Sequence, residues 1–109
     1  MTHKEILAMT EGLLKEHGVT GYVVNFWGDG WVYAQCNWNR RMISFNSTIG
    51  ESCGIDQIRN TALHEIAHAL VVQRGGEAWH YVNKGWTCHH EGWVKIAREL
   101  GCTDIDRHK

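Results

Sequence analysis

Two histidines and a glutamate occur together in "TALHEIAHAL", residues 61–70, where His64, Glu65 and His68 form a His-Glu-x-x-His pattern. Residues four apart on an α-helix lie one turn above each other, so both imidazoles could bind one metal ion. Glu65 lies beside the same point and could take a proton from a water bound to the metal. Zinc lowers the pKa of such a water toward neutrality. The spacing therefore predicts a hydrolytic zinc site with two ligands and a general base.

The alternative is a helix that simply exposes these side chains to solvent. The motif lies inside a strongly periodic helical segment, with the small residues Ala67 and Ala69 beside it. Uncompensated histidine and glutamate side chains would be costly to bury there. We therefore favour the metal site over a solvated helix face.

A third metal ligand is expected because catalytic zinc usually takes three protein ligands and keeps one position open. The metzincin extension of the motif is excluded, since Val71 and Arg74 replace its glycine and third histidine. The remaining downstream candidates are Glu77, His80, His89, His90 and Glu91. The last three open a predicted helix that can present its N-terminal end to the metal, and they are favoured. Spacing alone does not choose between His89 and its neighbours.

The elements that position these residues follow from hydrophobic periodicity. Helical spacing predicts three helices, over residues 4–17, 55–73 and 90–100. Concentrated Val, Ile, Tyr, Phe and Trp residues predict three strands, over about 21–27, 31–37 and 41–46. A "GDG" turn signal and a second turn near "NWNR" predict that these strands form an antiparallel sheet. Residues 75–88 are expected to form a loop, and the fold class is α+β.

Composition limits the function classes. The length of 109 residues fits one domain, here residues 1–109. Eleven Lys and Arg balance twelve Asp and Glu, so no overall field attracts nucleic acid or an anionic membrane. There is no apolar run of roughly 18 residues and no signal-peptide pattern, so we expect a cytoplasmic protein without a membrane partner. The four cysteines form no Cys-x-x-Cys pair and are expected to be reduced.

Six tryptophans are expected mostly to pack in and around the core. Only the segment around Trp38, with Arg40 and Arg41, combines an aromatic ring with basic residues. Such a segment could contact DNA, although two arginines in a turn are more often simply solvated.

The chain resembles the SprT-like metalloprotease family, the group that includes the DNA-dependent protease Spartan. The resemblance rests on the order of "CNWNRRMISFNS", "TALHEIAHAL" and "HHEGWVKIARELGC", and it covers nearly the whole chain. It implies a zincin-like fold and a gluzincin-like zinc endopeptidase acting on proteins, among them DNA-associated proteins. Matched residue by residue, it implies that His64, His68 and His89 bind Zn²⁺ and that Glu65 is the general base. The resemblance does not extend to the zinc ribbon of many bacterial members, because residues 1–109 hold no Cys-x-x-Cys pair.

Two questions remain open from the sequence. The oxyanion formed during hydrolysis needs a further donor, for which Tyr81, His80 and His90 are candidates. A non-proteolytic zinc-binding interaction module is the alternative function, and Cys88 could then supply a fourth ligand. The retained Glu65 argues against that alternative, because a purely structural zinc site needs no base.

Overall fold

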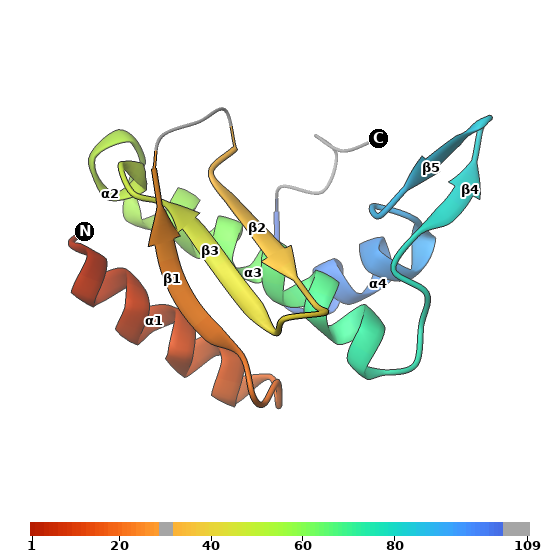
Figure 1. Cartoon of the computed structure of the whole chain (residues 1–109), viewed down its shortest axis with the longest axis horizontal. Helices are drawn as coiled ribbons and strands as arrows, with labels where there is room; N and C mark the ends of the chain where they lie inside the picture. The colour runs from red at the N-terminus through yellow and green to blue at the C-terminus, as the bar shows by residue number, and fades with distance from the viewer. Residues whose placement is uncertain (29–31, 104–109) are drawn as a thin grey trace.

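The computed structural model describes residues 1–28 and 32–103. Four helices and five strands follow one another in these residues (Figure 1). The helices are α1 (His3–Glu16), α2 (Ile49–Ser52), α3 (Ile55–Gln73) and α4 (Glu91–Glu99). The strands are β1 (Val23–Trp27), β2 (Ala34–Asn37), β3 (Met42–Asn46), β4 (His80–Val82) and β5 (Gly85–Thr87). The three long helices and first three strands match the predicted elements, and the mixed α+β class is confirmed.

The predicted antiparallel sheet is wrong in one pairing. The strand order is β1-β3-β2, with β3 antiparallel to β2 but parallel to β1. Ile43 and Phe45 of β3 are completely buried, so the most buried strand takes the centre and has a partner on each edge. The chain therefore crosses from β1 to the far side of β3 before it returns through the turn at residues 38–41. Of the expected "GDG" turn, Asp29 and Gly30 lie outside the described residues.

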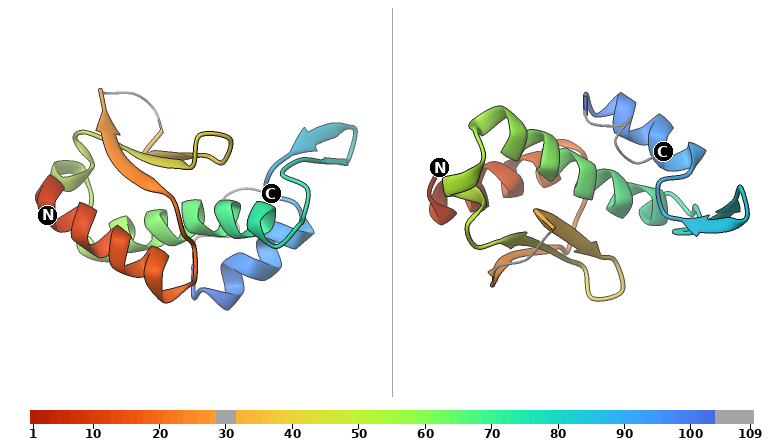
Figure 2. Two further views of the ribbon diagram at one scale, coloured as in Figure 1. Left: turned by 60° about the horizontal axis from the view of Figure 1, so that its bottom comes forward. Right: turned by 90° about the horizontal axis from the view of Figure 1, so that it is seen from above.

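Helix α3 forms the centre of the molecule. It lies between the three-stranded sheet on one side and α4 on the other (Figure 2). Every residue from Ala62 to Val71 is consequently buried, including the three polar residues of the His-Glu-x-x-His pattern. A helix that is buried on all sides cannot be a solvated surface helix. The solvated-face alternative is thereby excluded.

Helix α1 covers the outer part of the same core. Thr2 caps it, because its hydroxyl accepts from the Glu5 N–H while the Glu5 carboxylate accepts from the Thr2 N–H. Ile6, Leu13 and Leu14 face inward against β1 and α3. This helix supports the sheet and contributes no side chain to the histidine cluster.

The segment predicted to be a loop, residues 75–88, contains a β-hairpin instead. Strands β4 and β5 pair antiparallel, with Val82 opposite Gly85 across a two-residue turn. Both turn residues, Asn83 and Lys84, have positive φ angles of 49° and 64°. Such turns usually carry glycine at the second position, and lysine there hides the signal. The hairpin projects from the body beyond α4 (Figure 1).

The burial of the tryptophans and the state of the cysteines were also predicted. Of the tryptophans, Trp93 is fully buried, whereas Trp79 and Trp86 are exposed, and Trp31 lies outside the described residues. The four cysteines, all among the described residues, form no disulfide, as predicted. Among the described residues, no helix is long and apolar enough to cross a bilayer.

The central position of β3 predicts how two substitutions differ in their effect on stability. We expect Ile43→Ala to lower the free energy of unfolding by about 2–5 kcal/mol, because it leaves a cavity in a fully buried strand. Val23→Ala, on the exposed part of β1, is the control and should cost less than about 1 kcal/mol. Urea denaturation measures both values. Equal losses would contradict the central placement of β3.

Candidate metal centre

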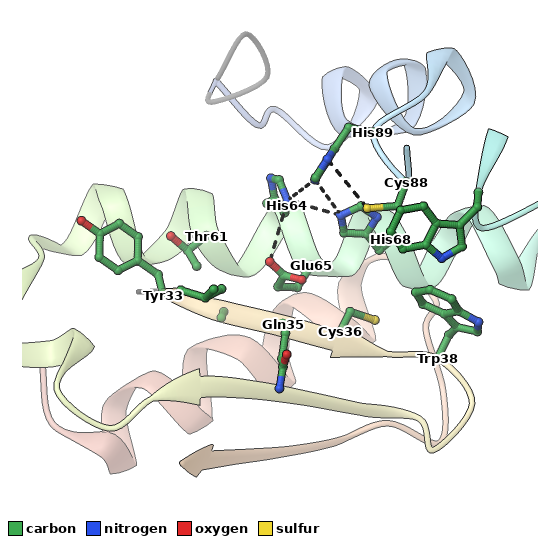
Figure 3. Close-up of a pocket in the computed structure, with 13 residues that line it drawn as sticks. Tyr33, Gln35, Cys36, Trp38, Thr61, His64, Glu65, His68, Cys88 and His89 are labelled. Carbon is green, nitrogen blue, oxygen red and sulfur yellow. Dashed lines mark hydrogen bonds and ion pairs between the residues drawn. The ribbon is translucent and has the colours of Figure 1, made fainter. Parts of the chain in front are cut away.

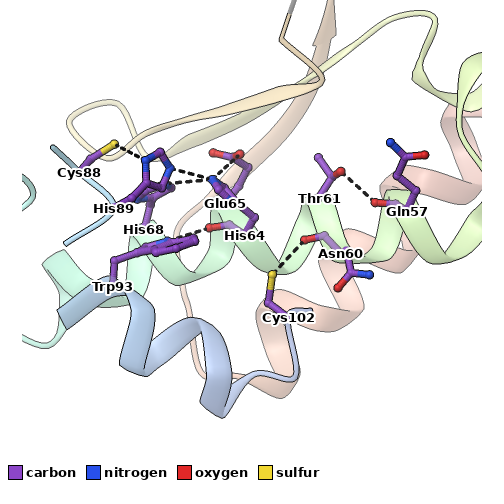
Figure 4. Close-up of polar contacts among 10 residues, drawn as sticks. All are labelled: Gln57, Asn60, Thr61, His64, Glu65, His68, Cys88, His89, Trp93 and Cys102. Atoms are coloured by element: carbon purple, nitrogen blue, oxygen red, sulfur yellow. Dashed lines mark hydrogen bonds and ion pairs between the residues drawn. The ribbon is translucent and has the colours of Figure 1, made fainter. Parts of the chain in front are cut away.

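Three histidines from two separate segments meet at one point. His64 and His68 lie on successive turns of α3, and His89 comes from the end of the segment that leads from β5 into α4. Their Nε2 atoms are 3.3 Å apart for His64 and His68, 3.2 Å for His68 and His89, and 3.1 Å for His64 and His89. Figures 3 and 4 show the three rings turned toward one another. These three side chains could together hold a metal ion.

The geometry of the three nitrogens fits a tetrahedral ion. With zinc–nitrogen bonds of about 2.0–2.1 Å, ligand nitrogens in a tetrahedron lie about 3.3–3.4 Å apart, close to the observed separations. Three nitrogens in a triangle cannot all satisfy one another by hydrogen bonds, because each neutral ring carries one N–H and one acceptor. An ion at the centre accepts all three lone pairs at once. The donor set therefore suits a divalent metal that prefers imidazole ligands.

Glu65 lies directly beside this cluster. Its Oε2 is 3.8 Å from the Nε2 of His64, and its side chain is almost completely buried. Burial raises the pKa of the Glu65 carboxyl to about 8. A cation bound to the neighbouring imidazoles would act in the opposite direction and favour the carboxylate. A cation bound at the three imidazoles would therefore change the protonation of this carboxyl group.

Trp93 of α4 forms the base of the cluster. It is fully buried, and its ring centre lies 4.7 Å from that of His64, 5.2 Å from that of His68 and 4.8 Å from that of His89. The indole N–H donates to the backbone carbonyl of His64 at 3.3 Å (Figure 4). One rigid side chain therefore contacts all three imidazoles and joins α4 to α3. Sequence reasoning counted Trp93 only as a helix-packing residue, because nothing in its spacing reveals this contact.

His89 and His90 have different environments. The His90 Nε2–H donates to the carbonyl of Glu77 at 2.8 Å, and its Nδ1 accepts from the N–H of Gly92 at 3.1 Å. Both ring nitrogens are therefore engaged, and His90 serves as the N-cap of α4. His89 instead directs Nε2 at the pair on α3, while its backbone N–H donates to the Thr87 hydroxyl at 3.0 Å. The geometry distinguishes two neighbours that spacing alone left open.

Other candidates from the sequence lie apart from the cluster. Tyr81 and His80 are exposed on the hairpin: the ring of Tyr81 packs against Trp86, and that of His80 stacks on His90. Neither they nor His90 line the cleft beside the histidines. Their proposed role as oxyanion donors has no support from this arrangement. Glu77 and Glu91 are also exposed and do not join the metal-binding group.

Cys88 is close to the centre without joining it. Its Sγ is 3.7 Å from Nδ1 of His89, the nitrogen on the far side of that ring from the Nε2 cluster. Burial raises the pKa of the Cys88 thiol, and burial together with the charge of Glu65 raises that of Cys36 to about 12. The position of the Cys88 thiol, on the Nδ1 side of the His89 ring, keeps it out of the group of converging nitrogens. The residues described place no fourth protein ligand among the three imidazoles.

A cleft of about 410 Å³ opens above the cluster. One wall is β2 and its flanks, with Val32, Tyr33, Ala34, Gln35, Cys36 and Trp38. The floor comes from α3, and the hairpin segment contributes Trp79, Cys88 and His89. Figure 3 shows Glu65 and the histidines between β2 and the segment that carries Cys88. The cluster is thus open to a molecule that enters along β2.

Comparison with known proteins identifies the family of the chain. The model of the SprT-like family matches residues 30–105, which is more than half of the chain. The chain belongs to the SprT-like family. No curated protein matches it. The matched region of this SprT-like chain contains β2, β3, α3, the hairpin and α4, and therefore every residue of the histidine cluster.

The different roles of His89 and His90 predict a clear difference in metal content. His89→Ala should weaken metal binding by more than the roughly 10–100-fold typical of a residue that only supports a ligand. His90→Asn should retain the metal, because asparagine can also cap the N-terminus of α4. Elemental analysis and competition with a chelator measure both variants. Loss of metal from His90→Asn with retention in His89→Ala would contradict the geometry.

Proposed function

We propose that this protein is a zinc-dependent endopeptidase. The observation that carries the proposal is the convergence of three imidazole Nε2 atoms within 3.3 Å of one another, beside one buried carboxylate and below an open cleft. Membership of the SprT-like family supports a metalloprotease-type function. The ligand atoms that these three residues offer are all imidazole nitrogens, which suit zinc.

His64, His68 and His89 would hold the ion, and the bound ion would act as a Lewis acid that polarises the scissile carbonyl and makes water more acidic. Glu65 is close enough to the cluster to serve as general base. Its carboxylate removes a proton from the attacking water and then donates that proton to the leaving amine. Glu65 lines the cleft but is almost completely buried, so the contact of its carboxylate with bulk water is limited.

Trp93 supports this chemistry as a positioning residue. It contacts all three imidazoles, and its N–H bond to the His64 carbonyl fixes α4 against α3. Small displacements of reacting groups lower the rates of enzymes strongly. A fixed base under the three rings therefore helps to keep the ligand geometry constant during turnover.

The substrate would enter as an extended segment. Within the described residues β2 is an edge strand, paired only with β3, and its free side borders the cleft. An extended peptide can add to such an edge through main-chain hydrogen bonds. This arrangement favours unfolded protein segments over small molecules as substrates. Folded substrates would have to expose a flexible stretch first.

The catalytic role of Glu65 can be tested by an isosteric substitution. With zinc bound, Glu65→Gln should lower the rate of casein cleavage by roughly 10²–10⁴-fold, because it removes the general base. Zinc content should be unchanged, since Glu65 is not among the three converging imidazoles. Equal cleavage by wild type and variant would contradict the enzyme and favour the non-proteolytic zinc-binding module.

DNA-associated proteins as substrates form a separate, narrower proposal. It is supported by the family and by the turn at residues 38–41, where Arg40 and Arg41 are exposed next to the half-buried Trp38. If DNA brings substrate to this turn, single-stranded DNA should raise the cleavage rate at low salt and have less effect at high salt. Cleavage rates measured with and without an oligonucleotide test this. A rate independent of DNA at both salt concentrations would exclude it.

A further inference from the structure

One end of the cleft has an aromatic wall that the proposed chemistry does not use. Figure 3 shows Trp38 and Cys88 at this end, while Tyr33 and Thr61 lie at the opposite end. Trp38 belongs to the turn between β2 and β3, and its side chain is half-buried. The histidines and Glu65 lie between the two ends.

A second tryptophan reaches the same end from the hairpin. In the β4–β5 ladder His80 pairs with Thr87, so the residues just outside this pair, Trp79 and Cys88, are neighbours across the base of the hairpin. The His80 ring also stacks on His90 with ring centres 3.9 Å apart, which holds the base of the hairpin against α4. Trp79 lines the cleft, and 47% of its surface remains exposed.

The chemistry of this wall indicates which side chain would cover it. Among the described residues that line the cleft there is no Lys, Arg or Asp, and Glu65 is the one carboxylate of that set. Glu65 lies between the two ends and is used by the proposed chemistry, so a charged side chain at the tryptophan end would lose hydration without an opposite charge of its own. An apolar side chain would cover exposed indole surface and release water from it. A nucleic-acid base could also stack on indole, but the lining residues that the structure describes offer no Lys or Arg to hold the phosphates.

We propose that Trp38 and Trp79 form a subsite, the Trp38/Trp79 subsite, that selects a large apolar side chain near the scissile bond of an extended protein segment. The inference rests on the proposed endopeptidase function and specifies its substrate class. A peptide added to β2 directs alternate side chains to the same face. One side chain next to the scissile bond would then fill the subsite, while its neighbours point away.

The first test maps cleavage sites in unfolded casein with the zinc-loaded full chain. We expect large apolar or aromatic residues to be enriched at one fixed position next to the cut, and charged residues to be depleted there. Trp79→Ala should reduce this preference about tenfold or more, as expected when a pocket loses a large apolar contact. Trp86→Ala is the matched control, because Trp86 lies on the same hairpin and is 68% exposed but does not line the cleft.

The second test measures binding without cleavage. Peptides that are identical except for one Phe, Ala or Asp are titrated into zinc-loaded Glu65→Gln protein. The Phe peptide should bind about tenfold more tightly than the other two, and adding Trp79→Ala should remove this difference. This binding measurement does not depend on cleavage of the peptide. Trp79 is exposed, so its truncation to alanine leaves no cavity in the core.

The outcomes separate the two proposals. Glu65-dependent cleavage without a side-chain preference, or equal effects of Trp79→Ala and Trp86→Ala, would overturn the subsite and leave the endopeptidase intact. Absence of cleavage, together with Trp79-dependent binding of the Phe peptide, would refute the endopeptidase and retain the subsite. Displacement of the Phe peptide by a single-stranded oligonucleotide would assign the surface to nucleic acid and overturn the inference.

Discussion

The structure depends on three imidazole rings that must approach within hydrogen-bonding distance of one another inside a small protein. Like-charged imidazolium ions could not share this space, so the rings have to be neutral or bound to a cation. A metal ion would meet this condition and, when bound, would contribute its binding free energy to folding. The histidine cluster therefore connects stability and chemistry: the ligands that would serve catalysis also hold α4 and its preceding segment against α3.

The burial of α3 follows from the same constraint. A surface helix could present two histidines to solvent, but it could not place Glu65 where water is excluded. Packing α3 between the sheet and α4 provides that environment, and Trp93 fills the space beneath the rings. The buried carboxyl, whose pKa is raised by desolvation, sits beside nitrogens that could bind a cation. The burial of α3 thus accounts both for the raised pKa of Glu65 and for the packing of the three rings.

The hairpin shows how a small domain extends its cleft. Its two strands pair only with each other and expose Tyr81 and Trp86 to solvent. The base of the hairpin is nevertheless held by the stacking of His80 on His90, and His90 in turn caps α4. His90, which the sequence offered as a possible metal ligand, therefore links the hairpin to α4. Through it, the position of Trp79 at the cleft is coupled to the helix that supports the metal centre.

Much of the site could be predicted from the sequence, because local spacing determines it. The interval of four residues places His64 and His68 on one side of a helix, and hydrophobic periodicity predicts α3 with the observed bounds of 55–73. Glycines after each periodic segment mark the helix ends for a similar local reason. The resemblance to the SprT-like family, confirmed by the match to residues 30–105, pointed to His89.

Only the tertiary structure decided the features that depend on distant residues. The parallel pairing of β1 with β3 arises because β3 is the most buried strand, which no local pattern specifies. The different roles of His89 and His90, the contact of Trp93 with three rings, and the meeting of Trp38 with the hairpin all join segments far apart in the chain. Periodicity reports which face of an element is buried, but packing determines which neighbour covers it.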